Sequence, residues 1–480
     1  MEIVSRLKRI VGPDRVSTSE TVCLAYSYSP FIGKGIVRKP DIVVLAETPE
    51  QVSEILKAAN RYRVPITPKG AVGGSGYAGP LRGGILLDLT FMDKIIRIDV
   101  DEMKTVAEAG CSFFKLSQEL FKNGLMLPTT EYGPGPNVAA SAIQPVNAFG
   151  KTRYGRNIEL VEGFEVVLPS GEITRVGSMA YADCDFGPYY RYITGPDLIG
   201  LWTKSNGAFG IVTKVAYQCL HRPKHWAFHS YYWPLEKIED VTRALMEATA
   251  LEMFDVHIND KWKYAGSDSG AEKPMLPEDC HFVVIFTVNA DNERELKGKE
   301  QTIVDMCTNH GGTYLRGIAE DFFTQWPTIF NPVSNPNIVK LFTAVRKAGS
   351  NYMYLYDSPN YPLSRFPEVY AKLMELGKKY EIWGFPRLTV FDGFAMKSQM
   401  MCSQTWAFIN DNDAHWVKQI HKCQAEFREW FGKKGGTFQS KLPPLVPEYC
   451  WTNQPGVFKL LKSIKALLDP NNILSPGTFE

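Results

Sequence analysis

A glycine-dense segment constrains the fold of this chain more than any other feature. Residues 69–80 read KGAVGGSGYAGP, and Gly74 to Gly79 match the G-x-G-x-x-G spacing of dinucleotide-binding loops. In a Rossmann fold a helix begins on the last glycine of that motif. Here Pro80 follows instead, and the next apolar run, Ile85–Leu89, is short and typical of a strand. The sequence therefore disfavours a Rossmann unit.

The same segment has two other interpretations. Val64–Thr67 is an expected strand, so the glycines connect two strands and can surround a phosphate with backbone N–H groups without any helix. The plain alternative is a surface hairpin that binds nothing. Four glycines within residues 70–76 exceed what one turn requires, and this favours the phosphate-binding loop.

Length and charge limit the class of protein. A chain of 480 residues is too long for one ordinary core, so we expect two domains. Its 53 Lys and Arg against 52 Asp and Glu give no charge that would indicate nucleic-acid binding. The start of the chain lacks the apolar core of a signal peptide, and no run approaches the ~18 apolar residues of a transmembrane segment. We expect a cytoplasmic protein.

Cysteine and histidine positions argue against a metal centre. The nine cysteines are scattered without any C-x-x-C pair, which is typical of reduced thiols and not of an iron–sulfur cluster or zinc ribbon. His415 and His421 are six residues apart on an expected helix, about 240° around its axis, so they cannot chelate one metal together. We predict no metal site.

The periodicity of apolar residues predicts mixed α and β structure. A helix is expected to begin at Thr48, with Val52, Ile55, Leu56 and Ala59 forming its buried stripe. The long stretch 127–157 is rich in small residues, and loops beyond ~15 residues in a compact domain are usually functional. After residue 222, strands alternate with amphipathic helices, the pattern of helices packed on an antiparallel sheet. We place a domain boundary there and predict an α+β protein.

Four blocks of this sequence form a recognisable set: TPEQVSEILKAANRYRVPITPKGAVGGSGYAGP, YGRNIELVEGFEVVLPSGEITRVGSMA, FGPYY with LWTKSNGAFGIVTK, and LDPNNILSPG. Together they resemble the FAD-linked oxidoreductase family of vanillyl-alcohol oxidase and p-cresol methylhydroxylase (PCMH), which also contains D-lactate and glycolate dehydrogenases. The resemblance implies a PCMH-type FAD-binding domain over 1–222, a substrate-binding cap domain with an antiparallel sheet over 223–435, and a C-terminal segment, 436–480, that returns to the FAD-binding domain.

The resemblance also implies which residues bind FAD. The glycine-rich loop would hold the pyrophosphate by its backbone, and small residues further on would line the cofactor because only they allow close backbone approach. The implied residues are Pro68, Lys69, Gly70, Ala71, Val72, Gly73, Gly74, Ser75, Gly76, Tyr77, Pro134, Gly135, Ser141, Ala142, Gly155, Gly210 and Ile211. No histidine precedes His221, so histidine attachment of the flavin from the phosphate-loop side is excluded. We predict non-covalent FAD, with a histidine or tyrosine of the cap as the open alternative.

Departures from the family pattern bear on the substrate. In the vanillyl-alcohol branch two tyrosines and an arginine stabilise a phenolate; Tyr77 matches the first tyrosine, but Phe438 and Gln439 stand where the second tyrosine and the arginine would fall. A phenolate would lose a hydroxyl donor and a cation here unless Gln439 or Arg387 replaces them. Arg156, in a position that is often acidic in that branch, could hold a carboxylate. The alternatives without a substrate contact are a structural ion pair for Arg156 and loop packing for Tyr77.

Three functions follow from this resemblance. The first is an oxidoreductase that transfers hydride to flavin N5 from an alcohol or activated benzylic carbon of a small aromatic substrate, with Tyr77, Arg156, Arg387, Phe438 and Gln439 as candidate catalytic residues. The second is a D-2-hydroxy acid dehydrogenase, although the paired-histidine metal motif of that branch is missing. The third is an electron-relay subunit. We expect a small-molecule substrate, a separate electron acceptor such as a cytochrome, an Fe–S protein or another flavoprotein, and a homodimer.

Overall fold

The chain divides into two compact units. The computed structural model describes residues 2–27, 38–70, 79–130, 135–144, 147–262, 276–318, 352–355, 358–383, 389–409, 413–438 and 453–479. Unit 1 comprises Met1–Val146, Arg156–Arg222 and Ser440–Glu480, and unit 2 comprises Asn147–Gly155 and Pro223–Gln439. The predicted boundary at 222 coincides with a unit boundary. Residues 147–155 differ, because they lie in unit 2 and not with the residues around them in sequence.

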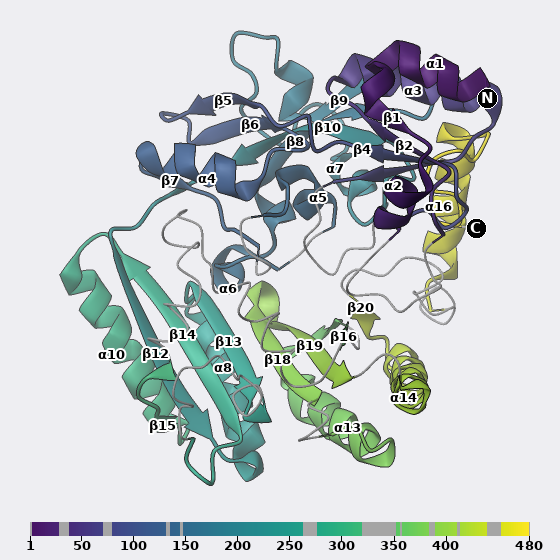
Figure 1. Cartoon of the computed structure of the whole chain (residues 1–480). Coiled ribbons are helices and arrows are strands. Elements are labelled where there is room, and N and C mark those ends of the chain that lie inside the picture. The colour runs from purple at the N-terminus through teal and green to yellow at the C-terminus, as the bar shows by residue number, and fades with distance from the viewer. Residues whose placement is uncertain are drawn as a thin grey trace. The chain divides into compact units, whose positions relative to one another are not determined.

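The first sheet of unit 1 carries the start of the glycine loop. Its order is β1-β2-β4-β3, in which β2, β4 and β3 are parallel and β1 is antiparallel to β2. The helix predicted from Thr48 is confirmed as α3, and the Thr48 side chain caps it by accepting from the Gln51 N–H at 3.2 Å. Helices α1 and α3 pack side by side (Figure 1). The elements are α1 (Glu2–Val11), β1 (Val16–Ser17), α2 (Glu20–Ala25), β2 (Ile42–Leu45), α3 (Pro49–Tyr62), β3 (Ile66–Lys69) and β4 (Ile85–Asp88).

A second, antiparallel sheet of unit 1 has the order β5-β6-β10-β8-β9. Its central strands β8 and β10 are buried nearly throughout, in keeping with their near-continuous apolar sequences. The chain between β7 and β8 carries α5 and η2, which pack on each other. The elements are β5 (Ile95–Asp99), β6 (Lys104–Glu108), α4 (Phe113–Lys122), β7 (Leu125–Met126), α5 (Val138–Ile143), η2 (Asn157–Leu160), β8 (Val161–Val167), β9 (Ile173–Gly177), α7 (Ile199–Trp202), β10 (Ile211–Gln218) and β11 (Leu220–His221).

The C-terminal tail joins the first sheet of unit 1. After helix α16 (Pro455–Leu468), the Ile66 N–H donates to the Ile473 carbonyl and the Ser475 N–H donates to the Ile66 carbonyl, both at 2.7 Å. Lys465 secures this return, since its ammonium donates to the Leu474 carbonyl at 2.7 Å and to the Ala208 carbonyl at 3.1 Å. The last residues of the chain therefore extend the sheet beside β3.

Unit 2 is an antiparallel sheet with a row of helices. The sheet order is β15-β12-β14-β13-β18-β19-β17-β20, with β16 also paired to β19. Helix α10 packs on β12 and β14, α8 on β13 and β18, and α14 on β19, while α13 contacts both α8 and α14 (Figure 1). The elements are α6 (Lys151–Tyr154), β12 (His225–Trp233), α8 (Ile238–Ala250), β13 (Asp255–Asp260), β14 (Phe282–Ala290), α10 (Glu293–Asn309), β15 (Thr313–Tyr314), β16 (Tyr352–Leu355), β17 (Pro359–Pro362), α13 (Phe366–Lys379), β18 (Thr389–Met396), β19 (Met400–Ile409), α14 (Ala414–Lys433) and β20 (Thr437–Phe438).

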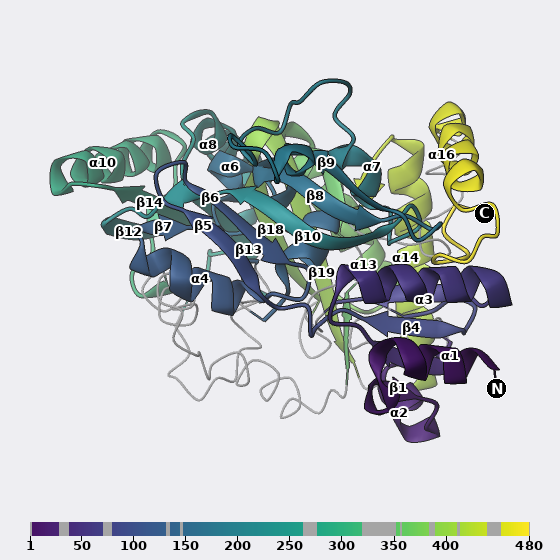
Figure 2. The same cartoon turned by 90° about the horizontal axis from the view of Figure 1, so that it is seen from above.

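Figure 2 shows the same elements from above, with β8 and β10 side by side in unit 1. Within the described ranges, no helix has both the length and the apolar character needed to cross a bilayer.

A buried histidine makes unit 2 sensitive to acid. His281 is 8% exposed, and its Nε2 lies 2.8 Å from the Tyr370 hydroxyl of α13. Burial, helped by the nearby Lys261 ammonium, lowers the pKa of His281 to about 4. Between this pKa and the ~6.5 of an unfolded histidine, the unfolded chain binds more protons, so stability falls as the pH falls through that window.

We expect acidification from pH 7 to pH 4 to cost roughly 3 kcal/mol through His281 alone. Urea unfolding of wild type and His281→Gln at both pH values measures this, and the variant should lose correspondingly less stability. His415→Gln removes an exposed histidine of α14 and serves as the control. An equal loss in His281→Gln and wild type would contradict the assignment.

Candidate functional site

The strand that enters the glycine loop ends against helix α5. Of the predicted phosphate loop, the structure describes Pro68, Lys69 and Gly70 at the end of β3, and Ala71 to Tyr77 lie outside the described residues. A Cβ on Gly70 would lie 2.5 Å from Nδ2 of Asn137 and 2.7 Å from its Oδ1. Asn137 is 1% exposed and caps α5 by accepting from the Ala140 N–H at 3.2 Å. Gly70 is therefore required where β3 meets the start of α5.

A second close approach lies on the other side of the same strand end. Gly207 has φ +77°, and a Cβ there would be 2.4 Å from Cγ of Pro68. The preceding Asn206 is fixed in turn, since its carbonyl accepts from the Ser475 hydroxyl at 2.7 Å. The 203–210 segment, the C-terminal tail and the strand leading to the glycine loop thus pack closely together.

The other predicted cofactor residues of unit 1 lie around this junction. Ser141 and Ala142 are buried on α5, whose Val138 carbonyl accepts from the Tyr217 hydroxyl at 2.8 Å. Ile211 begins the central strand β10, which packs against α5, and Gly210 directly precedes it. Among the described residues, no atom lies within 4 Å of the place where a side chain on Gly135 would begin. Pro134 lies outside the described residues, and Gly155 belongs to unit 2.

A buried amide beside α5 fits a ligand. Asn157, in η2, is 2% exposed, and neither atom of its side-chain amide has a hydrogen-bond partner among the described residues. Leaving such a group unsatisfied costs about 1–3 kcal/mol. A polar molecule that accepts and donates hydrogen bonds, as the isoalloxazine and ribityl parts of FAD do, would satisfy it. The residues present therefore fit the predicted cofactor.

The packing of the Lys69 side chain argues against a role as a free cation. Its ammonium lies 4.3 Å from the centroid of the Tyr26 ring, and the Tyr26 hydroxyl donates to Asp88 at 2.8 Å. Burial lowers the pKa of Lys69, and the nearby Asp88 carboxylate partly restores it. The side chain is thus part of the packing beside β3, so a contact of Lys69 with phosphate would be made by its backbone.

The candidate catalytic residues have mixed outcomes. Tyr77, Arg387 and Gln439 lie outside the described residues. Arg156 is half-buried in unit 1 and directly precedes η2. Phe438 ends β20, where its ring packs 5.2 Å from the ring of Phe431 on α14. This contact gives Phe438 a place in the core beneath the helices, and its predicted contact with substrate stays a prediction.

One face of the unit 2 sheet carries polar side chains where the strands pair. The register places Asp392 opposite both Asn259 of β13 and Gln404 of β19, and it places Cys402 opposite Asn360 of β17. Asn259, Asn360 and Gln404 are at most 6% exposed. Burying polar groups costs stability, so a polar layer on a sheet that is otherwise apolar is typical of a functional surface.

A histidine–carboxylate pair occupies the middle of this polar face. Nε2 of His257 bonds an Asp392 carboxylate oxygen, and the Asn259 amide donates to the same oxygen at 2.7 Å. The His257 ring also packs 4.4 Å, centroid to centroid, from Phe394. Asp392 therefore holds the imidazole in one orientation and one tautomer, which is the arrangement that a positioned proton acceptor needs.

A buried ion pair lies next to this histidine. The Lys151 ammonium bonds both Asp255 carboxylate oxygens, at 3.0 and 3.1 Å, and lies 4.4 Å from the centroid of the Phe394 ring. The backbone N–H of Gly150 donates to the same carboxylate at 2.6 Å. These contacts attach the 147–155 segment to β13. Together with the His257–Asp392 pair, they form a layer of polar contacts that extends from Asp255 to Asp392.

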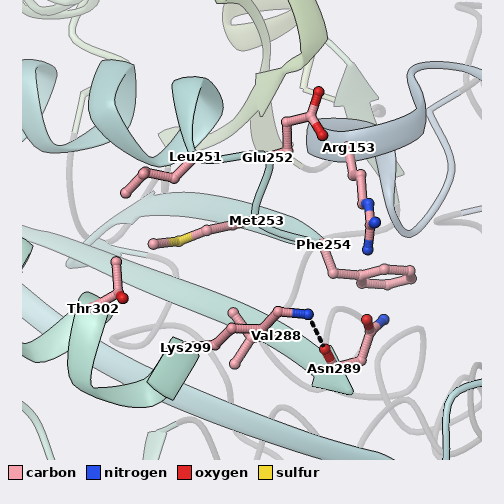
Figure 3. Close-up of a pocket in the computed structure, with 9 residues that line it drawn as sticks. All are labelled: Arg153, Leu251, Glu252, Met253, Phe254, Val288, Asn289, Lys299 and Thr302. Carbon is pink, nitrogen blue, oxygen red and sulfur yellow. Dashed lines mark hydrogen bonds between the residues drawn. The ribbon is translucent and has the colours of Figure 1, made fainter. Parts of the chain in front are cut away.

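Unit 2 also contains a small cavity of about 160 Å³. Figure 3 shows the Arg153 side chain directed toward the Phe254 ring, and the Lys299 ammonium bonded to the Asn289 carbonyl, at 2.7 Å. The remaining lining residues are Leu251, Glu252, Met253, Val288 and Thr302. Pockets for small-molecule ligands usually measure about 300–1,000 Å³, so this one has room for only a few atoms, and we assign it no ligand.

Two segments match known protein families. Residues 40–177 match the FAD binding domain, and residues 445–479 match the C-terminal domain of FAD linked oxidases. The first match covers the glycine loop, α5 and Asn157. The cofactor prediction, FAD, is thereby confirmed.

Curated relatives divide between two substrate types. The chain is 29% identical over 266 residues to a mitochondrial D-lactate dehydrogenase [cytochrome] of Arabidopsis thaliana, covering 53% of this chain and 44% of that protein. It is 27% identical over 223 residues to the 4-cresol dehydrogenase [hydroxylating] flavoprotein subunit of Pseudomonas putida, covering 46% and 42%. The chain thus spans about half the length of these relatives. A glycolate oxidase subunit of Bacillus subtilis is 23% identical, with 99% and 96% covered.

Solved structures confirm the predicted fold. A substrate-bound p-cresol methylhydroxylase covers 100% of this chain and 96% of its own, with a TM-score of 0.84 and 20% identity. The 4-ethylphenol oxidase of Gulosibacter chungangensis has the same TM-score and 19% identity. The α+β, PCMH-type prediction is correct.

Sequence reasoning missed several residues of these sites. Asn137 and Asn157 each lie next to a run of small residues. Only the structure shows that Asn137 lies against Gly70, and that the Asn157 amide has no hydrogen-bond partner among the described residues. His257 and Asp392 are 135 positions apart, and no local motif links them. The available signal was the alternation of polar and apolar residues in DVHIND, which puts Asp255, His257 and Asn259 on one face of a strand.

Proposed function

Because the chain belongs to the FAD-linked oxidoreductase family of vanillyl-alcohol oxidase and p-cresol methylhydroxylase, we propose that it oxidises an alcohol or an activated benzylic carbon of a small aromatic substrate. One observation supports the cofactor's role above all: β3, α5 and the 203–210 segment pack closely together, and the Asn157 amide of the same unit has no hydrogen-bond partner among the described residues. Bound FAD supplies the hydride acceptor in this chemistry.

The residues of the chain have two tasks in this proposal. In unit 1 the backbone of the glycine loop binds the phosphates, and Asn157 bonds a polar part of the cofactor. Unit 2 supplies the residues of the substrate-binding domain, and its polar face offers amide groups to a hydroxylated molecule. Tyr77, Arg156, Arg387 and Gln439 are the proposed substrate contacts, and FAD is proposed to be bound non-covalently.

The second candidate is oxidation of a 2-hydroxy acid. Arg156, at the start of η2, suits a carboxylate because a guanidinium can bind both oxygens. The names of relatives from Arabidopsis thaliana and Anaerostipes hadrus, both D-lactate dehydrogenases, agree with this class. The third function, electron relay, requires that no small molecule reduce the flavin.

Anaerobic bleaching of the bound flavin by a panel of compounds separates these functions. We expect aromatic alcohols and alkylphenols to bleach the flavin absorbance, and 2-hydroxy acids to be slower by at least tenfold in kcat/KM, which corresponds to about 1.4 kcal/mol. Bleaching by 2-hydroxy acids alone would replace the first candidate with the second. A flavin that dithionite reduces but no panel member bleaches would favour the electron-relay function.

A further inference from the structure

We propose that residues 182–198, the loop between β9 and α7 of unit 1, form the surface through which two copies of this chain make a homodimer. Five large apolar side chains of this loop face solvent, a higher density than in any other segment that the structure describes. They are Phe186, Tyr189, Tyr190, Tyr192 and Leu198, which are 47–88% exposed. Such a cluster on a globular protein typically marks an interaction site. The inference concerns assembly, so it does not depend on the proposed reaction.

Within unit 1, two arginines fix the loop to the second sheet. Arg97 of β5 donates to the Gly187 carbonyl at 3.2 Å. Arg191, in the loop itself, donates to Asp197 at 2.9 Å and to the carbonyl of Val161, the first residue of β8, at 3.4 Å. Because these contacts already hold the loop in place, it would lose little conformational entropy on binding a partner.

Contacts among the rings fix their orientation as well. The rings of Tyr190 and Tyr192 meet edge to face, with their centroids 5.5 Å apart, and the ring of Tyr189 lies 6.5 Å from that of Tyr181. Aromatic pairs at such separations stabilise each other. Tyrosine also supplies a large contact area at a low entropy cost, and aromatic residues are enriched in protein interfaces. The loop therefore presents a patch of defined shape and of the composition that protein partners recognise.

The exposed area of the rings is sufficient for a contact between two copies. An aromatic side chain offers about 150–250 Å², so four rings that are somewhat more than half exposed present about 500 Å² per copy. In a twofold dimer both copies use the same patch. The rings alone would then bury about 1,000 Å² in total, which reaches the size expected of a biological interface.

The charges of the loop favour a second copy over a charged partner. Asp183 is bonded to Arg175 of β9 at 2.5 Å, and Asp197 is bonded to Arg191. With Asp185, the patch has three acidic and two basic side chains, so it lacks a strong field of one sign. Such a field steers charged electron carriers, and an excess of Lys and Arg attracts anionic lipids. A nearly neutral patch can instead face its own copy without large like-charge repulsion.

Sedimentation velocity of the full chain with its bound FAD, over a range of protein concentrations, tests this inference. Wild type should dimerise at micromolar concentration, and Phe186→Ser with Tyr192→Ser should raise the dimer Kd at least 100-fold, because central aromatic residues contribute most to an interface. The matched control is Leu460→Ser with Leu467→Ser, which removes two similarly exposed side chains from α16 of the same unit. Its Kd should stay within twofold of wild type.

A thiol in the loop provides a second readout that changes none of the rings. Cys184 is exposed, unlike the other cysteines that the structure describes. Its alkylation by a maleimide, identified by comparison with Cys184→Ser, should slow as the protein concentration rises through the dimer Kd, because the second copy covers the loop. If the double variant of the rings fails to fold, this measurement decides. An alkylation rate that does not change with protein concentration would overturn the inference.

Two sedimentation results would also overturn it. One is a double variant whose Kd lies within threefold of wild type, since the dimer would then form through another surface. The other is a wild type that stays monomeric. In that case, binding to phosphatidylserine vesicles that is lost in the double variant would assign the loop to a lipid surface. Reoxidation of the flavin by cytochrome c that is lost in the double variant would assign it to an electron-acceptor protein.

Discussion

Replacing Gly207 with alanine should lower the affinity for FAD at least tenfold, or about 1.4 kcal/mol. Gly207 has φ +77°, where alanine is strained, and its new Cβ would be 2.4 Å from Cγ of Pro68. A proline ring cannot rotate away, so the end of β3 must move. That strand end leads directly into the predicted phosphate loop, and relieving such overpacking usually costs about 1–3 kcal/mol. Fluorescence titration of the apoprotein with FAD measures the loss.

Gly124→Ala is the matched control for this prediction. Gly124, after α4, has a similar φ of +68°, but no atom of the part of the chain that the structure describes lies within 4 Å of its Cβ position. It therefore carries the backbone strain without the clash, and its FAD affinity should stay within twofold of wild type. If both variants bind FAD equally well, the junction between Gly207 and Pro68 does not support the cofactor loop.

Replacing Lys151 with alanine should destabilise unit 2 by about 3–5 kcal/mol, because it leaves the Asp255 carboxylate buried without its cation. Lys151 is 0% exposed and Asp255 is 4% exposed, and the ammonium lies over the Phe394 ring. The 147–155 segment would lose its main attachment to β13. Scanning calorimetry and urea unfolding, monitored by the transition of unit 2, give the magnitude.

Two further variants make this result specific. Lys151→Met with Asp255→Asn removes both charges, so the double variant should be less destabilised than the sum of the single ones. Lys433→Ala removes an ammonium that bonds Glu429 on the exposed side of α14, and it should cost less than about 0.5 kcal/mol. If Lys151→Ala costs no more than Lys433→Ala, the buried pair does not anchor the segment.

Local sequence patterns predicted individual elements well. The apolar stripe of Val52, Ile55, Leu56 and Ala59 lies buried on α3, and the run Ile85–Leu89 contains β4. These predictions succeed because side-chain periodicity of 3.6 or 2 residues is set by the backbone geometry itself. The expected α+β class followed from such elements, whereas the FAD-binding family was expected from the resemblance of four blocks of the sequence.

The site was less accessible to sequence reasoning. The predicted domain boundary near 222 could not reveal that 147–155 belongs with unit 2, since Lys151 is held there by Asp255, 104 positions later in the chain. The ring of Phe438, a candidate from its place in a family motif, packs against Phe431, and its contact with substrate stays a prediction. The pairing of His257 with Asp392 depends on β13 and β18 being neighbours in the sheet. The order of residues along the chain does not show which strands become neighbours.

By itself, the amino-acid order determined where many strands and helices form, that a strand and not a Rossmann helix follows the glycine-rich segment, and which cofactor family the chain resembles. Only the tertiary structure decided that Asn137 braces Gly70, that Asn157 is buried without a partner among the described residues, and that His257 is bonded to Asp392. The physical reason is the distance along the chain over which each effect acts. Torsional preferences and periodicity act over a few residues, whereas burial and hydrogen bonding between distant segments arise only when strands and helices pack together.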